Sequence, residues 1–441
     1  MSAKVAKRRK GPKKRARPLP PEYNMLLTAT LCLLALGAVM VFSASSTTRI
    51  LQDGGLSDSA FYLKRTLLFG AVGLMIMVFA SRHGLRFIRQ LTPIFLAGSI
   101  FLLLAVLAVG TEVNGATRWL GGGFLQVQPS ELAKVALILY GADLLARKPK
   151  RVRSLEGIMP FLLVVGASSL LIMLQPDMGT TMVIAFSVGA LLVSAGVRPA
   201  DLGKIGLVIG VLALLMAVVE PYRMARLTSF LNPTADASGA GFQAAQAKIA
   251  LGSGGLFGEG LGNGVQKAFY LPEAHTDMIS AVIGEELGLV GIAGVVGLFA
   301  MFGYAGLKTA QKAKDVYGKL LVTGLTSLVL VQAVINLFAV MGMAPLTGVP
   351  LPFVSYGNSS LMASLLAVGL ILNVARGGTS AAARRSTPTR AGKLRVVDGG
   401  RSPARERNRA NGARKAKSGG SGGGNRGARR ARHGGRRRAS G

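Results

Sequence analysis

LPEAHTDMISAVIGEELG, residues 271–288, is the stretch in which a long polar segment gives way to an apolar one. If a helix begins near Asp277, positions three, four and seven residues further on return to nearly the same face. Below Asp277 that face carries only small residues: Ser280, Ala281, Gly284, Gly288 and Gly291. Such a strip is typical of a close helix contact or of the floor of a groove. An ionisable residue at membrane depth is costly and is therefore a functional candidate, but Asp277 also fits a simple helix cap at the positive dipole end.

The apolar runs on both sides of this stretch indicate a polytopic membrane protein. Half of the 441 residues are hydrophobic, and the mean hydropathy is +0.45. Candidate membrane-spanning helices lie near residues 25–44, 66–80, 91–110, 131–146, 158–174, 178–196, 204–219, 277–306, 319–341 and 359–375. Each is long and apolar enough to cross a bilayer. The predicted fold class is an all-α polytopic membrane protein with ten transmembrane helices and a large extracytoplasmic loop, residues 220–276, between helices seven and eight.

The distribution of basic residues predicts the orientation. An even number of spans puts both termini on one side, and the short connections on that side are rich in Lys and Arg: Arg82, Arg86 and Arg89; Arg147, Lys148, Lys150, Arg151 and Arg153; Arg198 and Lys204; Lys308, Lys312, Lys314 and Lys319. The positive-inside rule therefore places both termini in the cytoplasm. This membrane domain is predicted to cover residues 24–376.

Both ends of the chain carry much of the formal net charge of +33. Residues 1–23 and the Arg/Gly-rich tail 377–441 lack apolar periodicity, so they are predicted to be disordered cytoplasmic segments. Beside a membrane, anionic lipid headgroups are their expected partners. Nucleic acid is not expected, because the tail lacks interleaved aromatic residues for base stacking. With a single cysteine, Cys32, and three scattered histidines, neither a disulfide framework nor a metal site is expected.

The predicted outer face nevertheless carries cations, which the positive-inside rule disfavours there. They are Arg118, Arg223, Arg226, Lys248 and Lys267. A bound anion such as phosphate accounts for them. The alternative is that short outer loops tolerate a few cations without a functional role. Arg223 and Arg226 are three residues apart and would project from one side of a helix.

Two motifs are predicted at the same face. In QPSELAK, residues 128–134, Ser130 fits a helix N-cap and Glu131 a first-turn acid. Lys134 follows within the membrane and needs a partner, for which Glu131 is nearest. A structural ion pair and a functional pair both fit this spacing. In QPDMGTT, residues 175–181, Pro176 ends one helix and Asp177 is suited to cap the next.

Two further segments are irregular. PLTGVPLPFVSYGNSS, residues 345–360, contains three prolines and is therefore predicted to be extended or re-entrant, lining a cavity. Ser355 and Tyr356 are expected to face the same cavity as Asp277. GSGGLFGEGLGNG, residues 252–264, lacks the GK[ST] ending of a P-loop and is interpreted as a flexible hinge or a close-packing loop.

Taken together, these motifs resemble the SEDS family (shape, elongation, division and sporulation) of bacteria. The matching elements are GATRWL from Gly115, QVQPSELAK, QPDMGT, the loop from PYRMARLTSF to LPEAHTDMISAVIGEELG, and PLPFVSYGNSS. They cover about residues 24–376. LGNGVQKAFYLPEAHTD is more similar to the FtsW type of cell division than to the RodA type of elongation. Asn358 stands where the family usually has glycine.

The resemblance implies a peptidoglycan glycosyltransferase of the bacterial cytoplasmic membrane, at the division septum, that polymerises lipid II into undecaprenyl-pyrophosphate-linked glycan. An acidic residue at the outer face is then essential, and that role falls on Asp277. The residues expected to bind substrate are Arg118, Glu131, Lys134, Asp177, Arg223, Arg226, Lys267, His275 and Ser355. A divalent cation, Mg²⁺ or Mn²⁺, is compatible with the chemistry because the phosphates are ligands. A class B penicillin-binding protein transpeptidase and other divisome proteins are the implied partners. The alternatives are a lipid II flippase, a RodA-type polymerase and a scaffold without activity.

Overall fold

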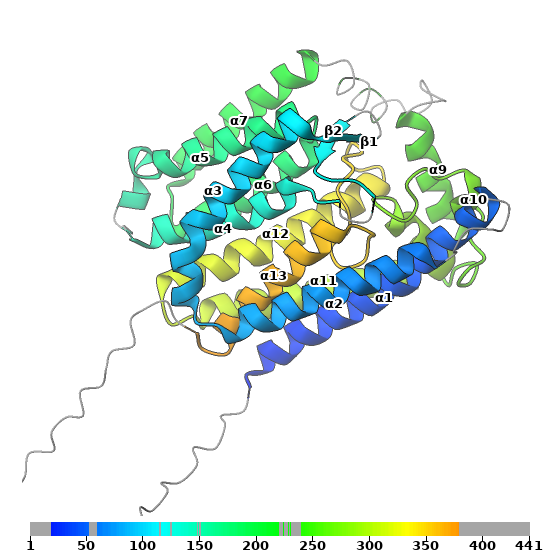
Figure 1. Ribbon diagram of the computed structural model, residues 1–441, viewed down its shortest axis with the longest axis horizontal. Helices are drawn as coiled ribbons and strands as arrows, with labels where there is room; N and C mark the ends of the chain where they lie inside the picture. Colours follow the sequence, from blue (N-terminus) through cyan, green and yellow to red (C-terminus); the bar gives the residue numbers. More distant parts are fainter. Residues whose placement is uncertain are drawn as a thin grey trace, which may run out of the picture. The chain divides into compact units, whose positions relative to one another are not determined.

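The computed structural model describes residues 19–52, 60–113, 116–123, 126–147, 149, 151–219, 224, 228, 230 and 240–378. Its helices are α1 (Pro21–Gln52), α2 (Phe61–Arg82), α3 (Leu85–Val109), α4 (Pro129–Arg147), α5 (Leu155–Leu174), α6 (Met178–Ala195), α7 (Pro199–Val219), α9 (Ala240–Ser253), α10 (Gln266–Phe269), α11 (Ile279–Gln311), α12 (Val316–Val340) and α13 (Asn358–Ala375). A 3₁₀ turn (Arg151–Arg153) lies between α4 and α5. The helical membrane fold is confirmed (Figure 1).

Among the described residues, eight helices are long and apolar enough to cross a membrane: α1, α2, α3, α5, α6, α11, α12 and α13. The predicted spans 131–146 and 204–219 fall in α4 and α7, which have 19 and 21 residues. The count of ten spans stays a prediction. The sequence did not predict the short antiparallel hairpin of β1 (Thr111–Val113) and β2 (Ala116–Trp119), which pairs Glu112 with Thr117 after α3.

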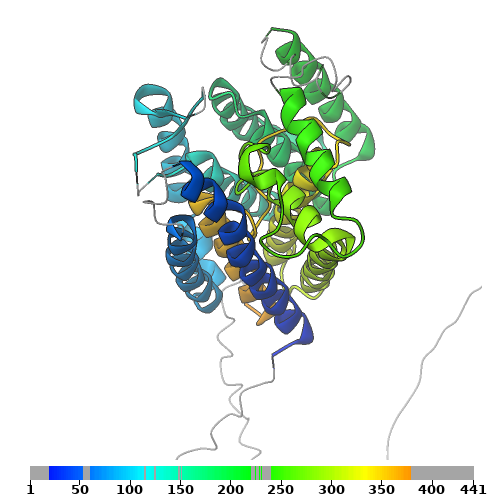
Figure 2. The ribbon, with the colours of Figure 1, turned by 90° about the vertical axis from the view of Figure 1, so that its right-hand side faces the viewer.

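The helices differ in how much of their surface other helices cover. The most apolar stretch of α13 is 83% buried and that of α12 67%, whereas those of α3 and α5 are only 28% and 22% buried. The helix α13 packs against α2, α12, α4 and α1 (Figures 1 and 2). Glycines let α2 and α13 approach closely, because a Cβ atom at Gly369 would lie 2.5 Å from the carbonyl oxygen of Met77. The exposed apolar faces of α3 and α5 are suited to contact lipid.

The helix α11 is interrupted at Gly288, where the sequence predicted an unbroken helix. Gly288 has φ 65° and ψ −161°, a conformation that only glycine adopts readily. The backbone groups freed by the break bond instead to the segment 252–264: Leu289 N–H to Gly255 O (3.0 Å), Val290 N–H to Leu256 O (3.2 Å), Glu259 N–H to Glu285 O (2.9 Å) and Gly260 N–H to Glu286 O (3.1 Å). The break therefore leaves these groups satisfied, as buried backbone requires.

The same segment and Leu251, the α9 residue just before it, cover the strip of small residues on α11. A Cβ atom at Gly284 would lie 2.3 Å from Leu251, and one at Gly288 would lie 2.4 Å from the backbone nitrogen of Gly258. Of the two interpretations of the strip, close packing is the one observed. The strip at Gly284 and Gly288 is not the floor of a groove, and the glycine-rich segment 252–264 is a close-packing loop.

Candidate active site

Asp277 lies two residues before α11 and is half-buried. The N-cap of α11 is Met278, and no side-chain hydrogen bond caps this helix. Asp277 is thus not the capping residue that the alternative interpretation required. Its Oδ1 atom accepts a hydrogen bond from Thr276 Oγ1 at 3.3 Å. The carboxylate therefore lies beside the first turn of α11, but it does not accept a capping hydrogen bond from the backbone N–H groups of that turn.

Asn336 on α12 fixes the backbone at Asp277. It is 2% exposed, and its Nδ2 atom donates to the carbonyl oxygens of Asp277 (2.7 Å) and Val349 (2.8 Å). Its Oδ1 atom accepts from Ser280 Oγ at 2.8 Å. Sequence analysis missed Asn336, although an asparagine inside the apolar run VQAVINLFAV is a recognisable signal. This one side chain joins the start of α11 to the proline-rich segment.

The proline-rich segment is irregular, as predicted, and passes beside Asp277. Residues 343–357 form no helix or strand. Gly348 has φ 69°, and a Cβ atom there would lie 3.9 Å from Asp277 Oδ2. The backbone of the segment therefore approaches the carboxylate. Ser355 is 6% exposed and accepts a hydrogen bond from Leu351 N–H at 2.8 Å, so its hydroxyl closes a turn within the segment.

An aromatic cluster lies next to Asp277. The backbone N–H of Tyr356 donates to the carbonyl of His275 at 3.0 Å. The ring centroids are 4.5 Å apart for Tyr62 and His275, 4.9 Å for Tyr62 and Tyr356, and 5.5 Å for His275 and Tyr356. The guanidinium carbon of Arg65, a buried residue of α2, lies 5.9 Å from the Tyr356 ring centroid. Sequence analysis missed Tyr62 and Arg65, because nothing local relates the start of α2 to residues 275 and 356.

Lys134 and Glu131 form a buried ion pair on α4. Their Nζ and Oε1 atoms are 2.9 Å apart, and both side chains are almost fully buried. Lys134 Nζ also donates to Gln332 Oε1 at 2.8 Å. The prediction that Glu131 is the partner of Lys134 is confirmed. The geometry matches a structural ion pair, which was one of the two interpretations of this spacing. Substrate binding by either residue stays a prediction.

One face of α12 connects this ion pair to Asp277. Gln332 and Asn336 are four residues apart and so project from the same face. Gln332 Nε2 donates to the carbonyl of Pro350 at 3.0 Å, and Asn336 Nδ2 donates to that of Val349. Two consecutive carbonyls of the proline-rich segment are thus held by two amides of α12. This places the backbone near Asp277 in a defined position.

Asp177 is the N-cap of α6, as predicted, and accepts a hydrogen bond from Thr180 N–H at 3.0 Å. Its other oxygen accepts from Gln128 Nε2 (3.2 Å) and Ser130 Oγ (3.4 Å). The prediction that Ser130 caps α4 is wrong. This helix begins one residue earlier at Pro129, which is favourable in the first turn, and the Ser130 hydroxyl bonds to α6.

Two of the predicted outer cations have protein partners. Arg118 on β2 donates through Nε to the carbonyl of Gln175 at 3.0 Å and through Nη2 to that of Pro176, so it stabilises the carboxyl end of α5. Lys267 is 3% exposed and pairs with Glu286 at 2.5 Å. Lys267 also donates to Ser43 Oγ at 3.0 Å. The prediction that Lys267 needs an anion from outside the protein is not supported, because Glu286 already neutralises it.

Arg223 and Arg226 lie outside the described residues, so their predicted role has no structural counterpart here. Within the part of the chain that the structure describes, no three His, Cys, Asp or Glu side chains are grouped to hold a metal ion.

The site as a whole lies where α3 and α5 end and where α4, α6, α11 and α13 begin. Figure 1 shows β1, β2, α9 and α10 at this end of the bundle. Asp277, His275, Tyr356 and the Gly348 backbone are brought together, while the Lys134–Glu131 pair is connected to them through α12. A carboxylate next to a fixed backbone and aromatic rings is suited to accept a proton from a sugar hydroxyl.

The chain is similar to known proteins over most of its length. The chain is 40% identical over 360 residues to the probable peptidoglycan glycosyltransferase FtsW of Trichlorobacter lovleyi, covering 81% of this chain and 94% of the relative. It is 41% identical over 358 residues to stage V sporulation protein E of Bacillus subtilis, covering 80% and 96%.

Two solved structures are similar. One is a chain of a peptidoglycan synthase complex that coordinates polymerisation and crosslinking, with a TM-score of 0.66, 29% identity, and 80% and 97% of the two chains covered. The other is the rod shape determining protein RodA of Thermus thermophilus, with a TM-score of 0.59, 29% identity, and 80% and 96% covered. Since residues 23–379 match the cell cycle protein model of FtsW, RodA and SpoVE, the chain belongs to this family, the SEDS family.

Proposed function

We propose that this chain polymerises lipid II into glycan strands at the outer face of the cytoplasmic membrane, with Asp277 as the general base. The activity class follows from the relatives, which are named peptidoglycan glycosyltransferases of the FtsW type. The chain is a peptidoglycan glycosyltransferase of this type, and its relatives' names fit septal wall synthesis. The role of Asp277 is supported by its half-buried carboxylate beside the fixed backbone of Gly348.

In the proposed step, the 4-hydroxyl of a GlcNAc residue attacks the anomeric carbon of the MurNAc that ends the growing glycan. The bond from that carbon to the undecaprenyl pyrophosphate breaks, and the configuration inverts. The hydroxyl proton passes to the Asp277 carboxylate. General base catalysis of this kind contributes about 10²–10⁴-fold to a rate. The rings of His275 and Tyr356 are suited to contact a sugar next to Asp277.

Lipid II flipping without chemistry is the second candidate, because a bundle with buried charges and an interrupted helix also suits transport. The position of the polar groups favours polymerisation. Asp277, Asp177 and the aromatic cluster gather where helices begin and end. Transport sites usually lie near the membrane midplane.

The test uses the purified full-length protein with lipid II. Asp277→Asn removes the base and keeps the side-chain shape. Glu259→Gln is the control, because it removes an exposed carboxylate of the segment 252–264 at the same end of the bundle. We expect Asp277→Asn to lower polymerisation by at least about 10²-fold and Glu259→Gln to leave it unchanged. Polymer formation by Asp277→Asn at the normal rate contradicts the assignment. Lipid II translocation without any polymer, in either protein, favours the flippase.

The partner and the topology belong to the same proposal. A class B penicillin-binding protein is the proposed partner, because a similar chain comes from a complex that coordinates polymerisation with crosslinking. The assay is therefore run with and without this transpeptidase. We also propose that the membrane domain, residues 24–376, crosses the membrane ten times and has both termini in the cytoplasm. The basic residues in the last turns of α2 and α4 support this orientation.

A further inference from the structure

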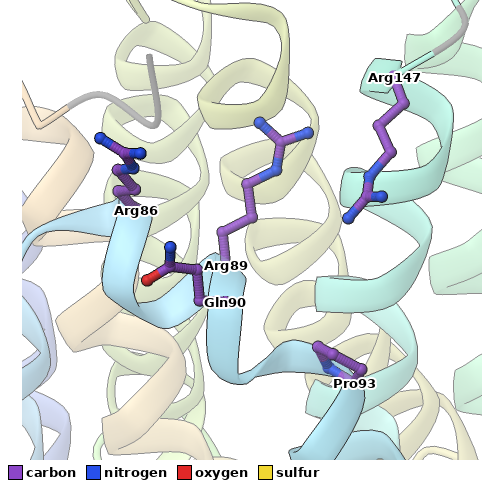
Figure 3. Close-up of a pocket in the computed structure, with 5 residues that line it drawn as sticks. All are labelled: Arg86, Arg89, Gln90, Pro93 and Arg147. Atoms are coloured by element: carbon purple, nitrogen blue, oxygen red, sulfur yellow. The ribbon is translucent and has the colours of Figure 1, made fainter. Parts of the chain in front are cut away.

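A cationic cavity lies at the opposite end of the bundle, where α3 begins and α4 ends. Arg86, Arg89, Gln90 and Pro93 of α3 and Arg147 of α4 line it, and its volume is about 240 Å³. In the view of Figure 3, Arg89 lies between Arg86 and Arg147, and Arg147 extends from α4 towards α3. The proposed active site does not use this arginine cavity.

A buried acid organises two of the arginines. Asp143 of α4 is 5% exposed and accepts hydrogen bonds from Arg147 Nε (3.1 Å), from Arg147 Nη2 (2.5 Å) and from Arg89 Nε. Arg86 is exposed and makes no hydrogen bond or ion pair with any residue that the structure describes. With three positive charges and one negative, these four side chains have a net charge of +2. Asp143 therefore orders the guanidinium groups without neutralising the cavity.

The outward surface of α3 next to the cavity is apolar. Phe87, Leu91 and Ile94 are 48%, 41% and 69% exposed, and they continue along α3 away from its first turn. Because α3 is long and apolar enough to cross a membrane, this surface is suited to acyl chains. A cationic cavity at the end of a lipid-facing apolar surface matches an amphiphile with an anionic head.

We propose that the arginine cavity binds the phosphate-bearing headgroup of an anionic phospholipid, with the acyl chains along α3. Arg86 supplies the charge not engaged by Asp143, and planar guanidinium groups match phosphate oxygens in pairs. The volume is below the roughly 300–1,000 Å³ of pockets that enclose a whole drug-sized ligand, so it suits a headgroup alone. The proposed orientation puts this end in the cytoplasmic leaflet, where anionic lipids attract basic cavities between helices.

Native mass spectrometry of the full-length protein in detergent tests the site with phosphatidylglycerol and phosphatidylcholine as probes. Arg86→Gln removes the cavity charge that Asp143 does not hold. Arg82→Gln, at the end of α2, is the matched control: it is exposed, does not line the cavity, and has no hydrogen bond or ion pair with a described residue. Both variants keep the two basic chain ends, whose lipid binding therefore cancels in the comparison.

We expect Arg86→Gln to bind phosphatidylglycerol at least about tenfold more weakly than the unchanged protein, because a hydrogen bond from a charged group is worth about 1.5–3 kcal/mol. Arg82→Gln should bind it as the unchanged protein does, and phosphatidylcholine binding should not differ. Equal losses in both variants would mean that charge alone attracts the lipid and would overturn the site. Displacement of phosphatidylglycerol by an equal concentration of glycerol 3-phosphate would assign the cavity to a soluble phosphate and overturn the lipid proposal.

Discussion

Replacing Asn336 by alanine tests whether this buried amide positions Asp277. The change removes three hydrogen bonds of 2.7–2.8 Å, to the carbonyls of Asp277 and Val349 and to Ser280 Oγ. At about 1 kcal/mol net for each bond, the free energy of unfolding should fall by about 3 kcal/mol. A catalytic group displaced by about 1 Å costs about 10²-fold in rate, so kcat for lipid II polymerisation should fall by one to two orders of magnitude, with a much smaller change in KM.

Asn373→Ala is the matched control for this prediction. Asn373 is also a buried amide, 4% exposed, and donates to the carbonyls of Ala80 (2.7 Å) and His83 at the other end of the bundle. Both variants should melt earlier than the unchanged protein when thermal unfolding is followed in detergent. Only Asn336→Ala should polymerise slowly below its melting temperature. A kcat within twofold of normal for Asn336→Ala, or an equal loss in Asn373→Ala, would refute a positioning role.

Two further predictions concern the segment 252–288. Lys267→Met leaves the Glu286 carboxylate buried without its counter-ion, although Ser43 Oγ still donates to it at 2.7–2.8 Å. The free energy of unfolding should therefore fall by about 3 kcal/mol, and adding Glu286→Gln should restore part of it. Thermal unfolding in detergent measures both changes, and an unchanged melting temperature for the single variant contradicts the ion pair. Gly288→Ala forces a side chain into a conformation costing about 1–3 kcal/mol and against the backbone of Gly258, so it should destabilise markedly. Gly294→Ala, on the same helix with open space around it, should be neutral or stabilising by up to about 1 kcal/mol, because alanine favours a helix more than glycine does. Equal melting temperatures for the two glycine variants would argue against the break in α11.

The motifs that sequence analysis interpreted correctly depend on interactions between residues that are close together in the sequence. Asp177 as a helix cap, Glu131 as the partner of Lys134, and the irregular proline-rich segment each depend on residues within a few positions of one another. Capping, one-turn ion pairing and the effect of proline on a helix are short-range, so a sequence predicts them well. Ser130 was the exception, since the preceding proline already starts α4.

The features that sequence analysis could not predict depend on contacts between residues that are far apart in the chain. Lys267 looked like an outer cation in need of an anion, but a buried carboxylate 19 residues away pairs with it. The strip below Asp277 allowed two interpretations, and only the docking of residues 251–260 on α11 selects between them. A periodic pattern identifies which residues share a face, but it does not identify what covers that face.

Apolar length, basic asymmetry and clustered motifs are properties of the chain, so they are enough to predict a helical membrane protein of the SEDS family and to single out Asp277. Only the assembled helices show that Asn336 and Gln332 hold the backbone beside Asp277, that α11 breaks at Gly288, and that Arg86, Arg89 and Arg147 line one cavity. These features join residues far apart in the chain. Their energies come from packing and buried hydrogen bonds that exist only once the helices have assembled.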